Sequence, residues 1–174
     1  MRGLILLPLI ALAACGGEGE QKAKAPERAE AIRPGQWEST IEITNLRKLD
    51  QGEPRLNLAR GTRLSGSACV GPAEVAEPPP ELFAGDDFDC EYTRTYMRRG
   101  RINIQMTCRH PSVRGEVYAM IDGRFTAETM EGALRYSTML PTDGDVEIAA
   151  NVTSRRTGDC TPAAGAEGNR SDAQ

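Results

Sequence analysis

The 174-residue chain has one histidine, few aromatic residues and no CxxC pair, and each scarcity excludes a class of site or protein. A single histidine, His110, cannot form a multi-histidine metal site within one chain. Aromatic residues make up 5% of the sequence, which predicts a modest hydrophobic core. The net charge is −4, so the chain lacks the basic excess that is typical of a nucleic-acid-binding protein.

The sequence also lacks an apolar run of the roughly 20 residues that a membrane-spanning helix needs. The apolar residues 4–12 follow the basic Arg2 and lead through small residues to Cys15. This arrangement resembles a bacterial lipoprotein signal. We therefore expect residues 1–14 to be a signal peptide and Cys15 to be the acylated first residue of the mature chain. The alternative is an unmodified cysteine in a transmembrane or ordinary secretory segment.

The residue after the cysteine bears on the expected location. In Gram-negative lipoproteins an aspartate there often marks retention in the inner membrane, and this chain has Gly16. Two or more acyl chains attach a protein firmly, whereas one chain holds it only marginally. We expect a lipid-anchored protein of the bacterial cell envelope that faces the periplasm, with the outer membrane favoured over the inner.

Composition divides the remaining chain into three parts. Residues 15–33 are rich in Gly, Glu, Lys and Ala, which predicts a lipidated flexible tether. Residues 34–160 form the predicted β domain. Residues 161–174 have no apolar pattern and are expected to be a disordered tail.

The dominant hydrophobic period between residues 34 and 160 is two, as in half-buried strands. For example, Trp37, Ser39, Ile41 and Ile43 alternate with polar residues. About eight short strands joined by tight turns predict an all-β antiparallel meander, either a curved sheet or a closed barrel. A short helical insertion is expected near residues 72–77, because the three prolines that follow cannot join a sheet.

Two further turns are predicted from local sequence. Asp122-Gly123 lies between alternating runs, and Asp-Gly is among the strongest short hairpin signals. Residues 141–144 are expected to connect a strand at 134–140 with one at 146–152.

Four cysteines remain besides Cys15, and an even number in an exported protein indicates two disulfides. Two alternating segments flank Arg98-Arg99-Gly100, a short loop in which glycine favours a tight turn. Folding about this loop sets Cys90 opposite Cys108 and leaves Cys69 to pair with Cys160. The same register places Tyr92 opposite Met106 and Tyr96 opposite Ile102. A zinc site is the alternative, but its usual CxxC spacing is missing.

Several residue types in the sequence invite a chemical role. The acidic residues at 86–91 invite a calcium site, but the glycine and distal glutamate of an EF-hand loop are missing. His110 has no identifiable nucleophile beside it, so a general-base role is not favoured. The methionines are scattered among strands, which favours core packing over copper binding: Met97, Met106, Met120, Met130 and Met139.

A basic group lies at the tip of the cysteine hairpin: Arg94, Arg98, Arg99 and Arg101. One interpretation is contact with anionic lipid or lipopolysaccharide head groups. The other is an edge strand that is protected by charge against aggregation.

Five short motifs occur along the chain in an order that resembles a known family. They are Pro34-Gly35-Gln36-Trp37-Glu38, Cys69-Val70-Gly71-Pro72-Ala73-Glu74, Asp89-Cys90, Met106-Thr107-Cys108 and Arg155-Arg156-Thr157-Gly158-Asp159-Cys160. Together they look like domain of unknown function 3617, a family of bacterial exported proteins that are often lipoproteins. The resemblance covers roughly residues 34–160. It implies no established activity, so no catalytic residue is carried over.

Two hypotheses of function follow. The first is a non-enzymatic envelope module that binds a partner protein or envelope component, or has a structural role. The second is a lipocalin-like barrel that carries a small apolar ligand in an interior cavity. No enzyme and no cofactor are expected, because no nucleophile–base pair or metal-ligand set emerges. The expected partners are membrane lipid through acylated Cys15 and either an envelope protein or the apolar ligand, with no nucleic acid.

Overall fold

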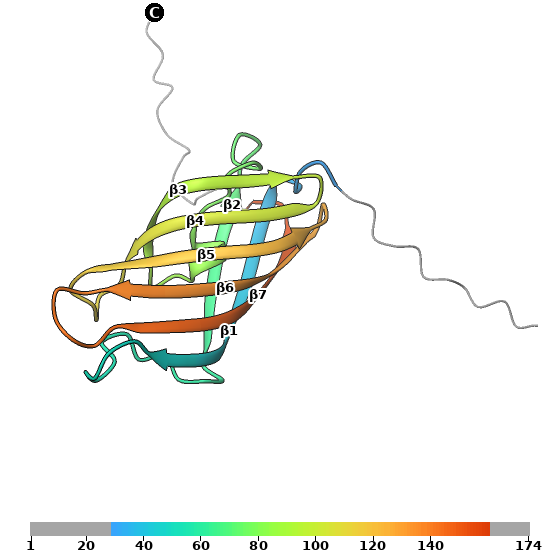
Figure 1. Ribbon diagram of the computed structural model, residues 1–174. Helices are drawn as coiled ribbons and strands as arrows, with labels where there is room; N and C mark the ends of the chain where they lie inside the picture. The colour runs from blue at the N-terminus through green and yellow to red at the C-terminus, as the bar shows by residue number, and fades with distance from the viewer. Residues whose placement is uncertain (1–28, 161–174) are drawn as a thin grey trace, which may run out of the picture.

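The structure is a computed structural model that describes residues 29–160 (Figure 1). The predicted signal peptide, Cys15, most of the tether and the C-terminal tail lie outside the described residues. Seven antiparallel strands form one sheet, in the order β2-β1-β7-β6-β5-β4-β3. The elements along the chain are β1 (Gly35–Lys48), β2 (Arg63–Val70), α1 (Glu81–Ala84), β3 (Asp89–Arg98), β4 (Arg101–Arg109), β5 (Glu116–Phe125), β6 (Thr129–Met139) and β7 (Val146–Gly158).

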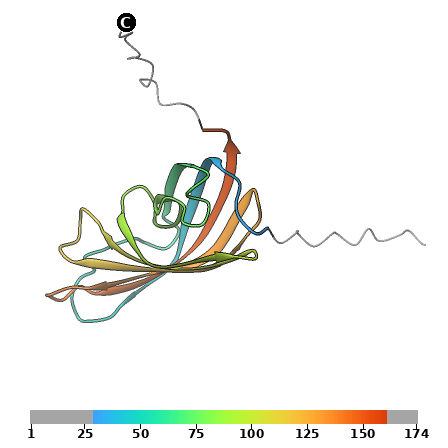
Figure 2. The ribbon, with the colours of Figure 1, turned by 90° about the horizontal axis from the view of Figure 1, so that it is seen from above.

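The predicted all-β meander is confirmed, and its curved-sheet form is the one observed. The sheet curls into a half-barrel, and its two edge strands, β2 and β3, are not paired with each other (Figure 2). Seven strands are present among residues 29–160, where about eight were expected. The closed barrel is therefore wrong for this chain.

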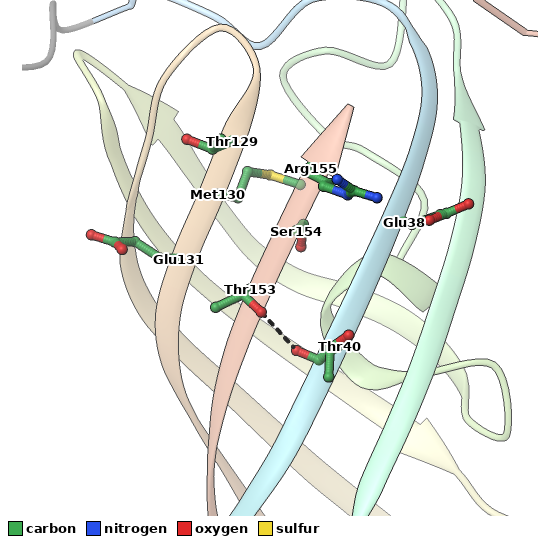
Figure 3. Close-up of a pocket in the computed structure, with 8 residues that line it drawn as sticks. All are labelled: Glu38, Thr40, Thr129, Met130, Glu131, Thr153, Ser154 and Arg155. Atoms are coloured by element: carbon green, nitrogen blue, oxygen red, sulfur yellow. Dashed lines mark hydrogen bonds between the residues drawn. The ribbon is translucent and has the colours of Figure 1, made fainter. Parts of the chain in front are cut away.

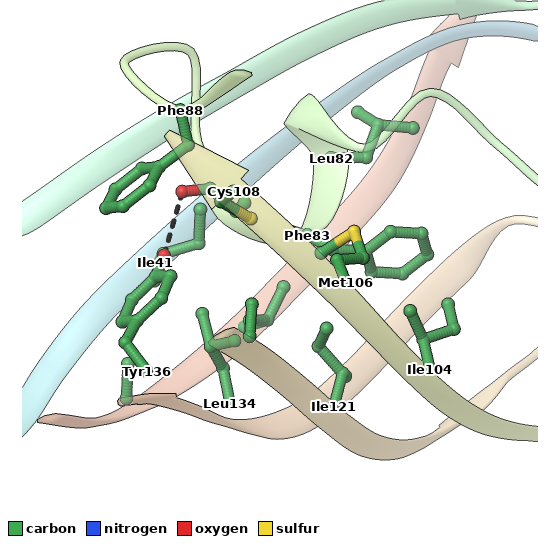
Figure 4. Packing of buried hydrophobic residues seen from close by; sticks show 14 of the residues in the cluster. Ile41, Leu82, Phe83, Phe88, Ile104, Met106, Cys108, Ile121, Leu134 and Tyr136 are labelled. Carbon is green, nitrogen blue, oxygen red and sulfur yellow. Dashed lines mark hydrogen bonds between the residues drawn. The ribbon is translucent and has the colours of Figure 1, made fainter. Parts of the chain in front are cut away.

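Period-two alternation builds the core on the concave face of this sheet. Along β1, Trp37, Ile41 and Ile43 are at most 1% exposed and Ser39 is 5% exposed, while Glu38, Thr40 and Glu42 face outward. Strands β4 to β7 repeat this alternation, with mostly apolar residues at the buried positions. The edge strands β2 and β3 each add one buried apolar side chain, Val70 and Met97. Helix α1 packs against these side chains and contributes three buried residues, Leu82, Phe83 and Ala84 (Figure 4).

The segment that connects β2 with β3, residues 71–88, bonds to the open edge of β2. Asp86 donates its backbone N–H to Ser65 O at 2.8 Å, and its carboxylate accepts the Ser67 N–H at 3.1 Å. On β3 the segment meets a side chain, since the Tyr92 hydroxyl donates to the carbonyl of Pro78. An open strand edge invites pairing with another chain. This connection therefore covers part of the β2 edge that barrel closure would have removed.

The helix of this connection lies at Glu81–Ala84 and not at the predicted residues 72–77. Residues 71–77 instead form successive turns, in which the Glu74 and Glu77 amides each bond three residues back at 3.0 Å. The Glu74 carboxylate also accepts the Gly71 N–H at 2.6 Å, which closes the first turn locally. Helix α1 begins only after Pro80, whose fixed φ of −64° suits a helix start.

A buried tyrosine ties α1 to the sheet. The Tyr136 hydroxyl donates to Ala84 O at 2.8 Å, and the Tyr136 ring stacks on Phe88 with ring centroids 4.9 Å apart (Figure 4). Burial raises the pKa of Tyr136 far above its ordinary value, so the hydroxyl stays a neutral donor.

The β3–β4 register agrees with the prediction only over its first half. Cys90 pairs with Cys108 and Tyr92 with Met106, as expected. A bulge between Tyr92 and Arg94 then shifts the register by one residue, so Tyr96 lies opposite Asn103 and not Ile102. Side-chain direction alternates along a strand, so this shift turns Tyr96 outward, where it is 47% exposed.

The predicted turn at Asp122-Gly123 is wrong, because both residues lie within β5. The chain reverses at residues 126–128, where the Thr126 N–H donates to Thr129 O at 2.8 Å. Gly123 is required instead by close packing, since it lies opposite Gly132 and a Cβ there would approach Glu131 O to 2.2 Å. The hairpin through residues 141–144 is confirmed between β6 and β7.

The last residues of the predicted tether contact the domain. Ile32 is 3% exposed and belongs to the core cluster. The Trp37 indole donates to Arg33 O at 3.0 Å, which fixes the entry of the chain into β1.

Asp50 joins two loops at the opposite end of the sheet. Its carboxylate accepts N–H groups from Asp145 and Gly144 at 2.8 Å each, and from Gly52 at 2.7 Å. The hydrogen bond from Asp145, followed by that from Gly144, lowers the pKa of Asp50 below its ordinary value. The ionised carboxylate therefore links the β1–β2 loop to the β6–β7 turn.

We expect Gly123→Ala to destabilise the protein by about 1–3 kcal/mol, the usual cost of forcing extra atoms into a packed site. The matched control is Gly158→Ala, because a Cβ on Gly158 meets nothing within 4 Å. Urea unfolding followed by circular dichroism measures both. Equal stability of the two variants would contradict the close approach of β5 and β6.

We expect Asp50→Asn to be less stable than the wild type at pH 7, with the difference shrinking in acid. A depressed folded-state pKa contributes stability that is present above the unfolded value, about 3.9, and is lost as the pH falls through the folded value. Thermal unfolding from pH 7 to pH 2 measures the difference. Asp143→Asn, an exposed change in the same turn, serves as the control, and a pH-independent gap would refute this role of Asp50.

Candidate functional site

The concave face of the half-barrel is occupied by side chains. Trp37, Tyr136 and Phe83 are all at most 1% exposed there and fill the space between the sheet and α1. The three hollows described here all lie instead on the outer face of the sheet, where the polar residues of each strand point. The outer face is therefore the candidate site.

The first hollow lies across β6, β7 and β1. Thr129, Glu131, Thr153, Arg155, Glu38 and Thr40 come together there from three strands (Figure 3). Thr129 is opposite Arg155 and Arg155 is opposite Glu38, so the polar side chains form a continuous row. This arrangement offers hydrogen-bond donors and acceptors of both charges.

The largest of the three hollows, about 1000 Å³, lies where β3, β4 and β5 meet the β5–β6 turn. Three arginines line it, Arg99, Arg101 and Arg124, with Tyr96 at its border. Asp122 and Glu131 also line it, and Asp122 accepts a hydrogen bond from the Asn103 amide at 2.6 Å. The hollow therefore carries charges of both signs.

Strand register places three of the arginines side by side. Arg98 is directly opposite Arg101, and Arg101 is directly opposite Arg124. Like charges in such cross-strand positions repel one another and destabilise a sheet. Together with Arg94 and Arg99, these residues form what we call the arginine surface: Arg94, Arg98, Arg99, Arg101 and Arg124.

The arginine surface has no carboxylate within ion-pair distance. Seven ion pairs join side chains of residues 29–160, and they use arginines elsewhere, such as Arg63 with Glu42 at 3.2 Å. None of the five arginines of the surface takes part in these pairs. Their positive charge is therefore presented to the surroundings.

A two-residue turn holds the tip of this surface. Arg99 and Gly100 both have positive φ, 52° and 70°, between the paired residues Arg98 and Arg101. This combination closes a tight hairpin whose twist suits the flanking strands, and it is unusual for an arginine.

Sequence reasoning found four residues of the arginine surface and missed Arg124. The missed residue adjoins Gly123, which had been assigned to a turn. With β5 continuous, Arg124 instead lies beside Arg101. Arg124 could be placed in the arginine surface only from the pairing of β4 with β5.

The four cysteines of the domain form two pairs in the structure. Cys90 joins Cys108 across the β3–β4 hairpin, with Cα atoms 4.0 Å apart. Cys69 at the end of β2 joins Cys160, with Cα atoms 5.5 Å apart, and so closes a long loop of chain. Cys15, the predicted lipidation site, lies outside the described residues.

The other candidate residues are placed as follows. His110 Nδ1 lies 2.8 Å from Ser112 Oγ and also accepts the Ser112 N–H at 3.2 Å, so the ring closes a local turn. Burial lowers the pKa of His110, against the opposing effect of Asp87. Sequence reasoning missed the Ser112 hydroxyl beside His110, although Ser112 lies only two residues after the histidine.

The acidic segment at 86–91 does not gather into a metal site within residues 29–160, where no group of three potential ligands meets. The methionines divide into two sets. Met97, Met106 and Met130 pack in the core, whereas Met120 and Met139 are 43% and 70% exposed, so core packing does not account for these two. In the described part of the chain, none of the helices has the length and apolarity needed to span a membrane.

A protein-family model described as "Protein of unknown function (DUF3617)" matches residues 32–160. No curated protein and no solved structure matches the chain. The matched region includes all seven strands, both cysteine pairs and the arginine surface.

We expect non-reducing peptide mapping to find Cys90 joined to Cys108 and Cys69 joined to Cys160. Trypsin separates Cys90 from Cys108 at the hairpin arginines, and cleavage after glutamate is needed to separate Cys69 from Cys90. A linkage between Cys69 and Cys90 would refute the observed pairing. The reduced sample, in which the linked masses vanish, is the control.

Proposed function

The chain belongs to the DUF3617 family of proteins of unknown function, and from this premise we propose that it is a membrane-anchored lipoprotein that serves as a non-enzymatic binding module of the bacterial envelope. Acylated Cys15 holds the protein at the membrane on the periplasmic side. The β domain provides the contact surface.

The observation that carries this proposal is that the two faces of the sheet differ. The side chains of the inner face pack together in the core, where Trp37, Phe83 and Tyr136 are at most 1% exposed. The outer face carries the hollows and the unpaired arginines. A carrier of an apolar compound would need an interior space of a few hundred Å³. The filled concave face therefore favours surface recognition over a carrier.

The cysteines support a location outside the cytoplasm. Both pairs lie at bonding distance in the structure, and disulfides persist in oxidising compartments. The leader sequence ends at Cys15 in the manner of a lipoprotein signal. The same motif therefore supports both export and anchoring.

We expect growing cells that express the protein to incorporate labelled palmitate into it, and the Cys15→Ser variant to incorporate none. The variant removes the sulfur to which the lipid would be attached, while the four cysteines of the β domain remain. Gel analysis of the purified proteins measures the label, and membrane flotation measures attachment. A wild-type protein that is unlabelled and remains in the soluble fraction would overturn the anchoring proposal.

A further inference from the structure

We infer that the arginine surface docks on the phosphate groups of anionic lipid head groups in the same membrane that holds the anchor. This inference rests on the proposed function, because it takes Cys15 as the point of attachment. It adds the ligand class and the orientation of the domain.

Edge protection does not explain the arginine surface. Charged residues on an edge strand discourage pairing with other chains, which accounts for Arg94 and Arg98 on β3. Arg101 lies on β4 and Arg124 on β5, and both strands are paired on each side. Their alignment with Arg98 makes a basic row that runs across three strands.

This row carries an electrostatic cost that an anion would relieve. Arg101 lies directly opposite Arg98 on one side and Arg124 on the other. Arg124 also lies opposite Glu131 on β6, but none of the three arginines takes part in an ion pair of residues 29–160. Guanidinium groups bind phosphate oxygens through pairs of N–H donors. Phosphates placed over the row would satisfy these donors and screen the repulsion between neighbouring arginines.

The position of the tether brings the same end of the domain to the membrane. Arg33 donates its N–H to Ala127 O at 2.9 Å, within the β5–β6 turn. Phe125, at the end of β5, donates to Gly100 O at 3.0 Å. The chain therefore enters the domain beside the tip of the β3–β4 hairpin, as both ribbon views show (Figures 1 and 2).

The length of the chain before the domain limits the distance between Cys15 and the domain. Fourteen residue steps separate Cys15 from Ala29, the first described residue. A fully extended chain of that length spans at most about 50 Å. The chain enters the domain at the end that carries the arginine surface, so this end is the part of the domain with the shortest path to the anchor.

The charge distribution along the β3–β4 hairpin favours the same orientation. Its tip carries arginines, whereas its base carries two carboxylates, Asp89 and Glu91, and one arginine, Arg109, which pairs with Asp89 at 3.7 Å. Negative charge at the base is repelled by an anionic surface and positive charge at the tip is attracted. Tyr96, which is 47% exposed beside the arginines, is a residue type that suits a membrane interface.

The test uses the full mature chain with Cys15→Ser, so that binding depends on the domain and not on the lipid. We expect this protein to co-sediment with vesicles of phosphatidylcholine and phosphatidylglycerol and not with phosphatidylcholine alone. Raising the salt from about 50 mM to about 500 mM should abolish the binding, because screening shortens the range of the attraction. Inorganic phosphate at matched ionic strength should not displace the protein from the vesicles.

The variant Arg98→Gln/Arg101→Gln/Arg124→Gln should lower the vesicle partition coefficient about a hundredfold, at about fivefold per arginine. The matched control is Arg55→Gln/Arg60→Gln/Arg114→Gln, which removes equal charge from the opposite end of the sheet and should change binding by less than about threefold. Circular dichroism melts of both variants verify that each is folded.

Two results would overturn the inference: equal binding to neutral and anionic vesicles, or equal weakening by the two triple variants. Displacement by inorganic phosphate would also overturn it, since it would indicate a site for a free anion. These outcomes are separate from the palmitate experiment. A lipidated protein whose arginines do not affect vesicle binding would retain the proposed function and lose this inference.

Discussion

The packing of α1 into the concave face of the sheet is the interaction on which the architecture depends. Leu82 and Phe83 lie against side chains from strands that are far apart in sequence, and burying each contributes about 1.5–3 kcal/mol. The Tyr136 hydroxyl satisfies the carbonyl at the end of this short helix. A four-residue helix has little stability of its own, so the sheet and the helix stabilise each other.

This packing determines where function can reside. The interior of the half-barrel is filled by side chains such as Trp37, Phe83 and Tyr136. This filling supports the proposal that recognition uses the outer face. The β2–β3 connection bonds to the backbone of the β2 edge, which disfavours strand addition there. The arginine surface gathers five arginines on the outer face, and none of them takes part in the ion pairs of residues 29–160.

Particular residues show where sequence reasoning succeeded and failed. The pairing of Cys90 with Cys108 followed from counting outward from a turn, because period two makes register countable. The count failed at Tyr96, where a bulge that leaves no local mark in the sequence shifted the strand by one residue. Asp122-Gly123 misled for a different reason. Gly123 lets β5 approach β6 closely at Gly132, and this contact follows only from the pairing of the two strands.

The sequence by itself determined the strand-rich class and the β3–β4 hairpin, and it predicts a lipoprotein-like leader, because each depends on residues that are close together in the chain. Only the tertiary structure decided that the sheet stays open, that α1 fills it and that Arg124 joins Arg98 and Arg101 in one row. The physical reason is that neighbours across a sheet are set by register and curvature. Both arise from packing between distant segments and cannot be read from local periodicity.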